Sequence, residues 1–370
     1  MNNRMCEMFG IEAPIFAFTH CRDVLVEVSK AGGLGVLGTS RLTPQKLREE
    51  LKWIDAHIGG RPYGIDVLMP SSFENLEGEQ KFDTQAMHPR EHAYLTKVLD
   101  EAGVGRLPEA DEAALLREAV HSVSFIPNDT RELIEIAFEH PISVFVSALG
   151  TPAKEIVDRA HARGIKVAAL AGAPKHALKH KEAGCDFVIA VGTEAGGHTG
   201  NITSMVLWPR IVDAVAPLPV LGAGGVARGR QVAAALALGC EGVWCGSVWL
   251  STAQSDVLPE LKAKLFAAPS EDAVLTKSVT GKQCRTLRNV YTDAMTMPGA
   301  PATLPPPLQA ILWWGHGIPR VNRSRIAAGL TTAVGQIVGD MTEELSVRQV
   351  FHDMLSELIE AKDRMDRQLS

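Results

Sequence analysis

At four places along the chain, a helix-like stretch ends in small residues and glycine and is followed by a short, almost continuously apolar segment. They are residues 30–38, 162–170, 182–192 and 238–246. Glycine closes a helix at low cost because it adopts the left-handed backbone conformation, and Gly164, Gly184 and Gly239 stand at such helix ends. Strands that are apolar along their whole length are covered on both faces, as in parallel sheets. The pattern therefore predicts alternating helices and buried parallel strands.

Eight candidate strands of this kind occur along the chain, at 13–18, 33–38, 63–68, 142–147, 165–170, 186–191, 218–223 and 241–246. Each leads towards a helix, and no GxGxxG motif opens a first strand–helix turn. This count favours a (β/α)8 TIM barrel over a doubly wound sheet. We therefore expect an α/β protein built on a closed barrel.

The length of 370 residues exceeds the roughly 250 that one such barrel needs. We expect a barrel domain at 1–250, interrupted after the third strand by an insertion at 71–125 with helix-like stretches near 90–102 and 109–120. Residues 251–370 are expected to form a mostly helical C-terminal extension that packs on the barrel. Its last helix carries an apolar stripe, which we expect to pack on its own chain or, as the alternative, to form a homodimer contact. The stripe consists of Val347, Val350, Phe351, Met354, Leu355 and Leu358.

Composition is that of an ordinary globular protein, with 46% apolar and 22% charged residues. The net charge of −6 offers no basic surface for nucleic acid. No apolar run approaches the roughly 20 residues that span a bilayer, and the first residues lack a signal-peptide core. The six cysteines show neither CxxC nor Cys/His zinc spacing, so buried reduced thiols are expected. We therefore expect a cytoplasmic protein without membrane, nucleic-acid or metal partners.

Two glycine-rich loops follow the seventh and eighth strands, where barrels of this class usually bind phosphate. In the first, GAGGVARGR, Gly222, Gly224 and Gly225 let backbone amides approach an anion, towards which the next helix directs its N-terminus. In the second, WCGSVWL, Gly246 and the Ser247 hydroxyl can complete the cradle. Either loop alone could be only a tight turn, but together they predict a ligand that carries phosphate.

The loop after the sixth strand, VGTEAGGHTGN, places one imidazole, His198, among Gly196, Gly197 and Gly200. Histidine titrates near neutral pH and commonly acts as a general base, while bare glycine backbone can lie against a flat ring. We therefore expect a functional His198. Glu194 on the same loop either orients the imidazole or caps the loop, and the sequence does not separate these roles.

Three further strand ends carry weaker candidates. His20 follows the first strand and is expected to be either a second acid/base or substrate contact or a helix cap. Asp66 stands at the end of the third strand and is expected to be either a ligand contact or half of an ion pair. Cys21 and Cys245 also lie at strand ends, without a histidine that the sequence assigns to them.

The segments AGGLGVLG, EAGGHTG, PVLGAGGVARGRQVAAALALGCEGVWCGSVWL and GKQCRTLRN together resemble the nitronate monooxygenase family of FMN-dependent barrels, formerly called 2-nitropropane dioxygenases. The resemblance covers roughly residues 10–250 and patches of the tail, including VGQIVG at 334–339. It implies His198 as the catalytic base and Gln336 as a substrate contact. It also implies that noncovalent FMN binds at Asp66, Gly172, Val191, Gly196, Gly197, Gly224, Gly225, Trp244, Cys245, Gly246 and Ser247.

Three positions depart from the family's usual residues. Asp66 stands where members often carry Asn, Val191 where they carry Gln, and Thr199 where they carry Arg. Contacts that the backbone makes to FMN are unaffected by such changes. The choice of substrate therefore stays open.

The resemblance implies oxidation of a small alkyl nitronate or nitroalkane by O2 to a carbonyl compound and nitrite. The alternative is an FMN- and NAD(P)H-dependent reductase of an enoyl or acyl thioester on acyl carrier protein or coenzyme A. A phosphate-sugar isomerase or aldolase would share the phosphate loops. Its Schiff-base lysine is not evident, since Lys166 stands at the start of its strand.

Overall fold

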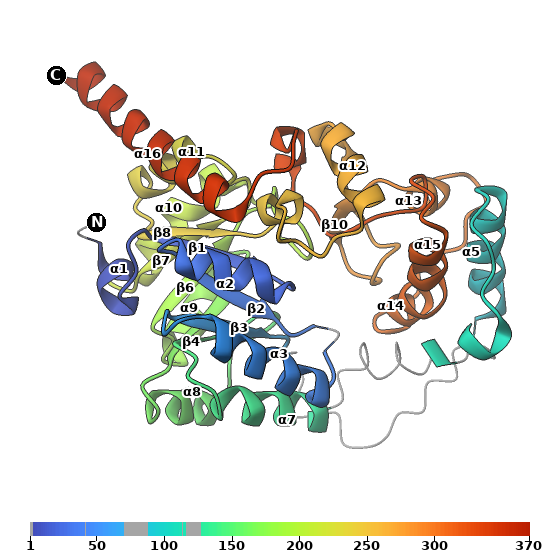
Figure 1. Ribbon diagram of the computed structural model, residues 1–370, viewed down its shortest axis with the longest axis horizontal. Helices are drawn as coiled ribbons and strands as arrows, with labels where there is room; N and C mark the ends of the chain where they lie inside the picture. Colours follow the sequence, from blue (N-terminus) through green and yellow to red (C-terminus); the bar gives the residue numbers. More distant parts are fainter. Residues whose placement is uncertain (1–2, 41, 70–87, 113, 116–126) are drawn as a thin grey trace.

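The structure is a computed structural model, which describes residues 3–40, 42–69, 88–112, 114–115 and 127–370 of the protein. Its centre is a closed barrel of parallel strands, in which each strand pairs with the next and the eighth pairs with the first (Figure 1). The strands are β1 (Ile15–Thr19), β2 (Leu34–Gly38), β3 (Tyr63–Val67), β4 (Val144–Ser147), β5 (Lys166–Ala171), β6 (Phe187–Val191), β7 (Val220–Ala223) and β8 (Gly242–Cys245). The predicted (β/α)8 barrel and its eight strands are confirmed.

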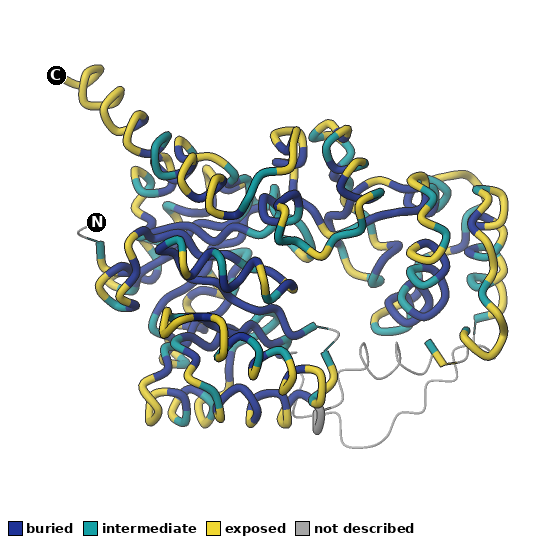
Figure 2. The backbone as a smooth tube through the Cα atoms, viewed as in Figure 1, coloured by how far each residue is buried: buried dark blue, intermediate teal, exposed yellow. Residues whose placement is uncertain are grey.

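The strands are buried on both faces, which explains why their sequences run apolar without alternation (Figure 2). Side chains that point inward fill the barrel, among them Phe16 and Phe187. The N-terminal helix α1 (Arg4–Phe9) closes one end, because the ring of Phe9 lies edge-on at 5.5 Å from Phe16 and 5.9 Å from Phe187. The amino ends of the strands are thus plugged, and the carboxyl ends remain for a ligand.

Helices alternate with the strands and cover the outside of the barrel. They are α2 (Arg22–Lys30), α3 (Pro44–His57), α7 (Pro127–Phe138), α8 (Lys154–His161), α9 (Pro174–Glu182), α10 (Ser204–Val215) and α11 (Gly229–Ala237). Local signals set their ends: Thr43 accepts a hydrogen bond from the Lys46 amide and Pro44 occupies the first turn of α3.

Part of the insertion forms the helix α5 (Pro89–Glu101), close to the range expected from the sequence. Residues 109–112 and 114–115 are also helical, and the rest of that second expected stretch lies outside the described residues. The helix α5 packs against the C-terminal extension, and together they form a lobe beside the barrel (Figure 1). The Tyr94 hydroxyl donates to the Ala294 carbonyl at 2.7 Å, and buried Arg320 donates to Asp100 at 2.6 Å.

The C-terminal extension mixes short helices with one antiparallel strand pair. The short helix η2 (Ser247–Ser251) follows β8, and the elements of the extension are α12 (Pro259–Ala267), η3 (Ser270–Asp272), β9 (Ala273–Thr276), β10 (Cys284–Leu287), α13 (Val290–Ala294), α14 (Leu308–Leu312), η4 (Trp313–Gly317), α15 (Ile318–Ser324), η5 (Gln336–Asp340) and α16 (Val347–Leu369). The apolar stripe of α16 packs on α11 and α2 of the same chain. Residues 362–370 of this helix are exposed, and its C-terminal end projects from the body of the protein (Figure 1).

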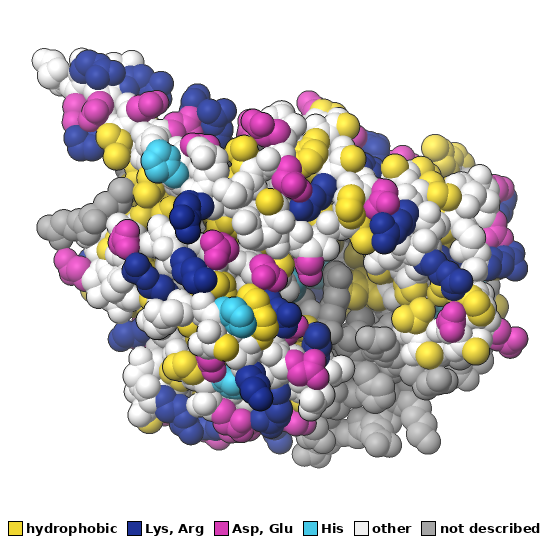
Figure 3. All heavy atoms as spheres, in the orientation of Figure 1, with side chains coloured by type: hydrophobic (Ala, Val, Ile, Leu, Met, Phe, Trp, Pro, Cys, Tyr) yellow, Lys and Arg dark blue, Asp and Glu magenta, His cyan; other side chains and the backbone are white. Residues whose placement is uncertain are grey.

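Acidic and basic side chains intermingle on the surface that Figure 3 shows. In the part of the chain that the structure describes, none of the helices has the length and apolar character required to pass through a bilayer. All six cysteines are described and buried, and none of them forms a disulfide.

We predict that Gly229→Ala destabilises the contact between α11 and α16. A Cβ atom at Gly229 would lie 2.0 Å from the Met354 carbonyl oxygen and 2.3 Å from the Leu358 amide nitrogen, so the two helices would have to separate. The free energy of unfolding in urea should fall by about 1–3 kcal/mol. The control is Gly105→Ala, whose Cβ meets no heavy atom within 4 Å. Equal stabilities of the two variants would contradict this packing.

Candidate active site

The residues expected to form a site lie where the strands of the barrel end. Asp66 and Val191 are on β3 and β6, Trp244 and Cys245 end β8, and the others stand in the loops that follow. These loop residues are His20 after β1, Gly172 after β5, Gly196, Gly197 and His198 after β6, Gly224 and Gly225 after β7, and Gly246 and Ser247 after β8. Gln336 comes from the C-terminal extension, as the first residue of η5. Parallel strands in a closed barrel bring these ends to one rim.

His198 keeps an exposed face on this rim, and its Nδ1 lies 3.0 Å from the carbonyl oxygen of Gln283. Because a carbonyl only accepts, Nδ1 carries the hydrogen in the neutral ring, which leaves a lone pair on Nε2. Burial among the surrounding loops lowers the pKa of His198, and the charge of Lys282 lowers it further against the raising effect of the Gln283 hydrogen bond. The imidazole is therefore held neutral, in the tautomer that accepts a proton at Nε2.

The C-terminal extension fixes the loop that carries His198. Gly197 and Arg285 exchange two backbone hydrogen bonds, of 2.9 Å and 2.7 Å, as in an antiparallel sheet. The Arg285 guanidinium donates to the Thr193 carbonyl from Nε at 3.1 Å and from Nη2 at 2.9 Å. Backbone and side chain of one buried arginine therefore hold both ends of the turn.

A second segment of the extension joins two of the barrel loops. The Gln336 amide donates to the Glu194 carbonyl at 2.9 Å, and the Gly335 amide donates to the Ser247 hydroxyl at 2.8 Å. Gly196 must lack a side chain, because its Cβ would lie 2.8 Å from the backbone of Val334. Gln283, Arg285 and Gly335 received no individual role from the sequence, although GKQCRTLRN and VGQIVG contain them and carried part of the resemblance.

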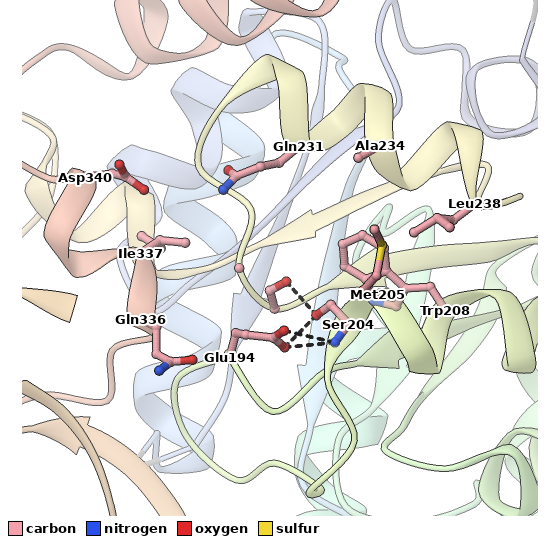
Figure 4. A pocket seen from close by; sticks show the side chains of 12 residues that line it. Glu194, Ser204, Met205, Trp208, Gln231, Ala234, Leu238, Gln336, Ile337 and Asp340 are labelled. Atoms are coloured by element: carbon pink, nitrogen blue, oxygen red, sulfur yellow. Dashed lines mark hydrogen bonds between the residues drawn. The ribbon is translucent and has the colours of Figure 1, made fainter. Parts of the chain in front are cut away.

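Glu194 caps a helix rather than orienting the imidazole. Its carboxylate accepts from the Ser204 amide at 3.0 and 3.1 Å and from the Ser204 hydroxyl at 2.8 Å, at the start of α10 (Figure 4). The Ser204 hydroxyl also lies 2.9 Å from the Gly224 carbonyl oxygen, which ties the loop after β6 to the loop after β7. The open question about this residue is thereby answered.

A pocket of about 350 Å³ adjoins these loops, between α10, α11 and η5. It brings together three of the expected residues, Gly224, Gly225 and Gln336, with Glu194 beside them. Trp208, Met205 and Leu238 give it an apolar wall (Figure 4). The remaining expected residues stand on the rim outside this pocket.

The loop after β7 has the features of an anion cradle. Gly224 and Gly225 have φ angles of +97° and +74°, which favour glycine, and a Cβ at Gly224 would approach the Gly192 carbonyl oxygen to 2.9 Å. Within the described ranges, the amides of Gly225 and Val226 donate no hydrogen bond, so they are available to a phosphate. The residues present thus fit a phosphorylated ligand.

Thr199 adds a second indication of a ligand. Its hydroxyl oxygen is buried and has no hydrogen-bond partner among the residues that the structure describes. A buried hydroxyl left unpaired costs about 1–3 kcal/mol. Its position next to His198 indicates that a molecule bound at this rim supplies the partner.

The other expected residues support the rim in different ways. The ring of Trp244 stacks on Phe18 at 5.9 Å, and His20 Nδ1 lies 2.9 Å from the Gly38 carbonyl oxygen. Burial raises the pKa of the Cys245 thiol to about 12, so that it stays protonated and unreactive. The loops after β5 and β6 touch at Gly172 and Gly200, where a Cβ at Gly200 would lie 2.8 Å from the Gly172 oxygen.

Asp66 is the one fully enclosed carboxyl group of the expected set, with 4% of its surface exposed. Burial raises its pKa from 3.8 to about 8, because the charged form loses its hydration. At neutral pH the group is therefore mainly protonated. It can donate a hydrogen bond, as the asparagine common in the related family can.

We predict that Asp66 makes the cofactor-free protein less stable as pH rises from about 4 to about 8. Across this range the folded state retains a proton that the unfolded state has released, so the free energy of unfolding falls with pH by a few kcal/mol. Asp66→Asn should remove this decline, whereas the exposed control Asp353→Asn should keep it. Urea titrations at about pH 5 and about pH 9 measure the difference, and parallel curves for the Asp66→Asn variant and the native chain would contradict it.

The chain is similar to known proteins along most of its length. The sequence profile of the family described as nitronate monooxygenase matches residues 2–357. A protein named "Putative monooxygenase Rv1533" from Mycobacterium tuberculosis is 43% identical over 369 residues, which cover 97% of each chain. A "Probable nitronate monooxygenase" of Staphylococcus aureus is 26% identical over 313 residues, which cover 80% of each chain.

Solved structures share the whole fold. A nitroalkane oxidase from Streptomyces ansochromogenes superposes with a TM-score of 0.79 at 25% identity, over 98% of this chain and 99% of that one. FabK from Thermotoga maritima superposes with a TM-score of 0.74 at 24% identity, over 100% and 99% of the two chains. The family and the nitroalkane oxidase neighbour imply an oxidoreductase with a flavin cofactor. By its sequence along nearly the whole chain, this protein belongs to the nitronate monooxygenase family.

Proposed function

We propose that this chain binds FMN without a covalent bond and oxidises small nitroalkanes or their nitronates with O2, with His198 as the base. The observation that carries the proposal is the hydrogen bond from His198 Nδ1 to the Gln283 carbonyl, which leaves Nε2 free to accept a proton at the rim. In the net reaction, two nitroalkanes and one O2 give two carbonyl compounds and two molecules of nitrous acid, released as nitrite.

The loops after β7 and β8 would hold the FMN phosphate. The amides of Gly225 and Val226 are available as donors, and Gly246 and Ser247 come from the next strand end. The flat ring would lie against Val191, Gly196 and Gly197, with Asp66 and Gly172 nearby. When bound, FMN supplies the electron transfer and the reaction with O2.

His198 prepares the substrate. Its Nε2 takes the proton from the carbon next to the nitro group, and the resulting imidazolium keeps both ring hydrogens. The Nδ1 hydrogen stays on the Gln283 carbonyl, while the new Nε2 hydrogen donates to an oxygen of the nitronate anion. The exchange of hydrogen bonds between Gly197 and Arg285 fixes the height of the imidazole above the rim.

A reductase of an enoyl or acyl thioester remains a second candidate. Its support is that a FabK and the enoyl reductase domain of MlnA from Bacillus amyloliquefaciens have the same fold. Anaerobic mixing of the FMN-loaded protein with a nitronate and, separately, with NADPH distinguishes the two. Rapid bleaching of flavin absorbance by the nitronate, and nitrite formation with O2 uptake in air, support the oxidase. Bleaching of the flavin by NADPH but not by the nitronate would overturn the proposed oxidase function.

We predict that His198→Ala lowers kcat/KM for a neutral nitroalkane by about 100-fold or more, because proton abstraction loses its base. Turnover of a preformed nitronate, which needs no proton removal, should fall much less. The control is His352→Ala on α16, with an exposed imidazole far along the chain from the barrel. Flavin absorbance verifies loading of each variant, and equal losses on both substrates would contradict a role as base.

We predict that kcat/KM for the neutral nitroalkane rises with pH to a plateau whose midpoint lies below pH 6.5, the ordinary value for histidine. Burial and Lys282 favour the neutral imidazole, which is the form that acts as a base, so activity is lost only as the solution becomes acidic. The kcat/KM for a preformed nitronate should not show this loss at acidic pH. A midpoint above 6.5 would contradict the environment assigned to His198.

A further inference from the structure

A group of potential metal ligands lies in the lobe that α5 forms with the C-terminal extension. His92 comes from α5, Glu112 from the short helical segment that follows, and His316 from the π-helix η4. Their ligand atoms all lie within 4.8 Å of one another. Two neighbouring segments of the insertion and one distant segment of the extension thus bring two imidazoles and one carboxylate together.

The contacts within this group leave one imidazole nitrogen unsatisfied. His316, which is 2% exposed, has its Nδ1 2.8 Å from Glu112 Oε1. His92 Nε2 lies 3.8 Å from the same oxygen, too far for a hydrogen bond. Within the described part of the chain this buried nitrogen has no hydrogen-bond partner. The two rings meet edge to face, with their centroids 4.4 Å apart.

We propose that His92, Glu112 and His316 bind a divalent transition-metal ion, for which Zn²⁺ is the best match, with water completing the coordination. Imidazole and carboxylate are ligands that Zn²⁺ accepts at about 2.0–2.2 Å, which in a tetrahedron places ligand atoms about 3.3 Å apart. The observed separations of 2.8 Å and 3.8 Å lie on either side of this value. Small rotations of the side chains are enough to form the site.

Charges of both signs lie around the group. The nearby guanidinium of Arg320 donates to Asp100, at 2.6 Å, and to the carbonyls of Val104 and Gly105, and Asp100 also pairs with Arg106. Glu112 supplies one negative charge at the site.

His88 belongs to the surroundings of the site. Residues 88–92 read HPREH, a spacing that carries zinc ligands where both histidines lie on one helix. Here His88 precedes α5 with φ of −141° and ψ of 56°, so only His92 stands on the helix. The H-x-x-E-H arrangement of a peptidase is therefore not formed. The metal's role is to join the insertion to the extension, independently of the reaction at the barrel rim.

The test is a titration of the full chain, free of any histidine tag and treated with a chelator, with Zn²⁺ alone. We expect one Zn²⁺ per chain by equilibrium dialysis, and binding about 10-fold or more weaker in His92→Ala and in Glu112→Gln. The matched control His352→Ala, an exposed histidine on α16, should bind as the native chain does. Equal binding by the native chain and both ligand variants, or no binding by the native chain, would overturn the proposal.

Two measurements guard against a variant that merely fails to fold. Glu112→Gln keeps the size of the side chain and an oxygen that accepts from His316, and circular dichroism checks each variant. Co²⁺ in place of Zn²⁺ should give the intense visible bands of tetrahedral coordination in the native chain and in His352→Ala but not in His92→Ala. Zn²⁺ should raise the Tm of the native chain and of His352→Ala but not that of His92→Ala. A folded Glu112→Gln variant with native Co²⁺ bands and Tm shift would refute the site.

Discussion

The two hydrogen bonds between Gly197 and Arg285 join the loop that bears the imidazole to a strand of the C-terminal extension, and the rest of the site follows from this pairing. A loop rich in glycine has little conformational preference of its own, so an outside partner must define it. Arg285 does this through its backbone and, on the Thr193 carbonyl, through its side chain. Gln283, two residues earlier, then meets His198. The extension is therefore part of the proposed active site.

The closed barrel makes this arrangement possible by leaving one accessible end. Phe9 from α1 packs on Phe16 and Phe187 at the amino ends of the strands. The carboxyl ends, in contrast, carry the glycine-rich loops that follow β6 and β7. Segments of the extension cross this end at residues 283–285 and 334–336 and contact the loops after β6 and β8. The loops after β6 and β8 are thus held on one side by the barrel strands and on the other by hydrogen bonds to the extension.

Much of the fold could be predicted from the sequence because its signals are local. A glycine that ends a helix and an apolar run after it mark four of the eight strands, apolar runs alone mark the others, and the observed strands agree within a few residues. The rim position of His198 and Gly225 follows from the barrel itself. The partners Gln283 and Arg285 could not be predicted, because they act on distant backbone atoms and leave no spacing pattern. The same holds for His92, Glu112 and His316, which only the folded lobe brings together.

The packing of α5 on the extension has a consequence for how the protein is made. The buried face of this helix includes Leu95, Val98 and Leu99, and its covering helices α13 and η4 come from residues 290–317. During synthesis this apolar face emerges about two hundred residues before its cover, and chaperones or aggregation act on such exposed surfaces. Shortening the chain to the barrel alone would leave the face in water permanently. The insertion and the extension must therefore be kept or removed as a pair when the protein is engineered.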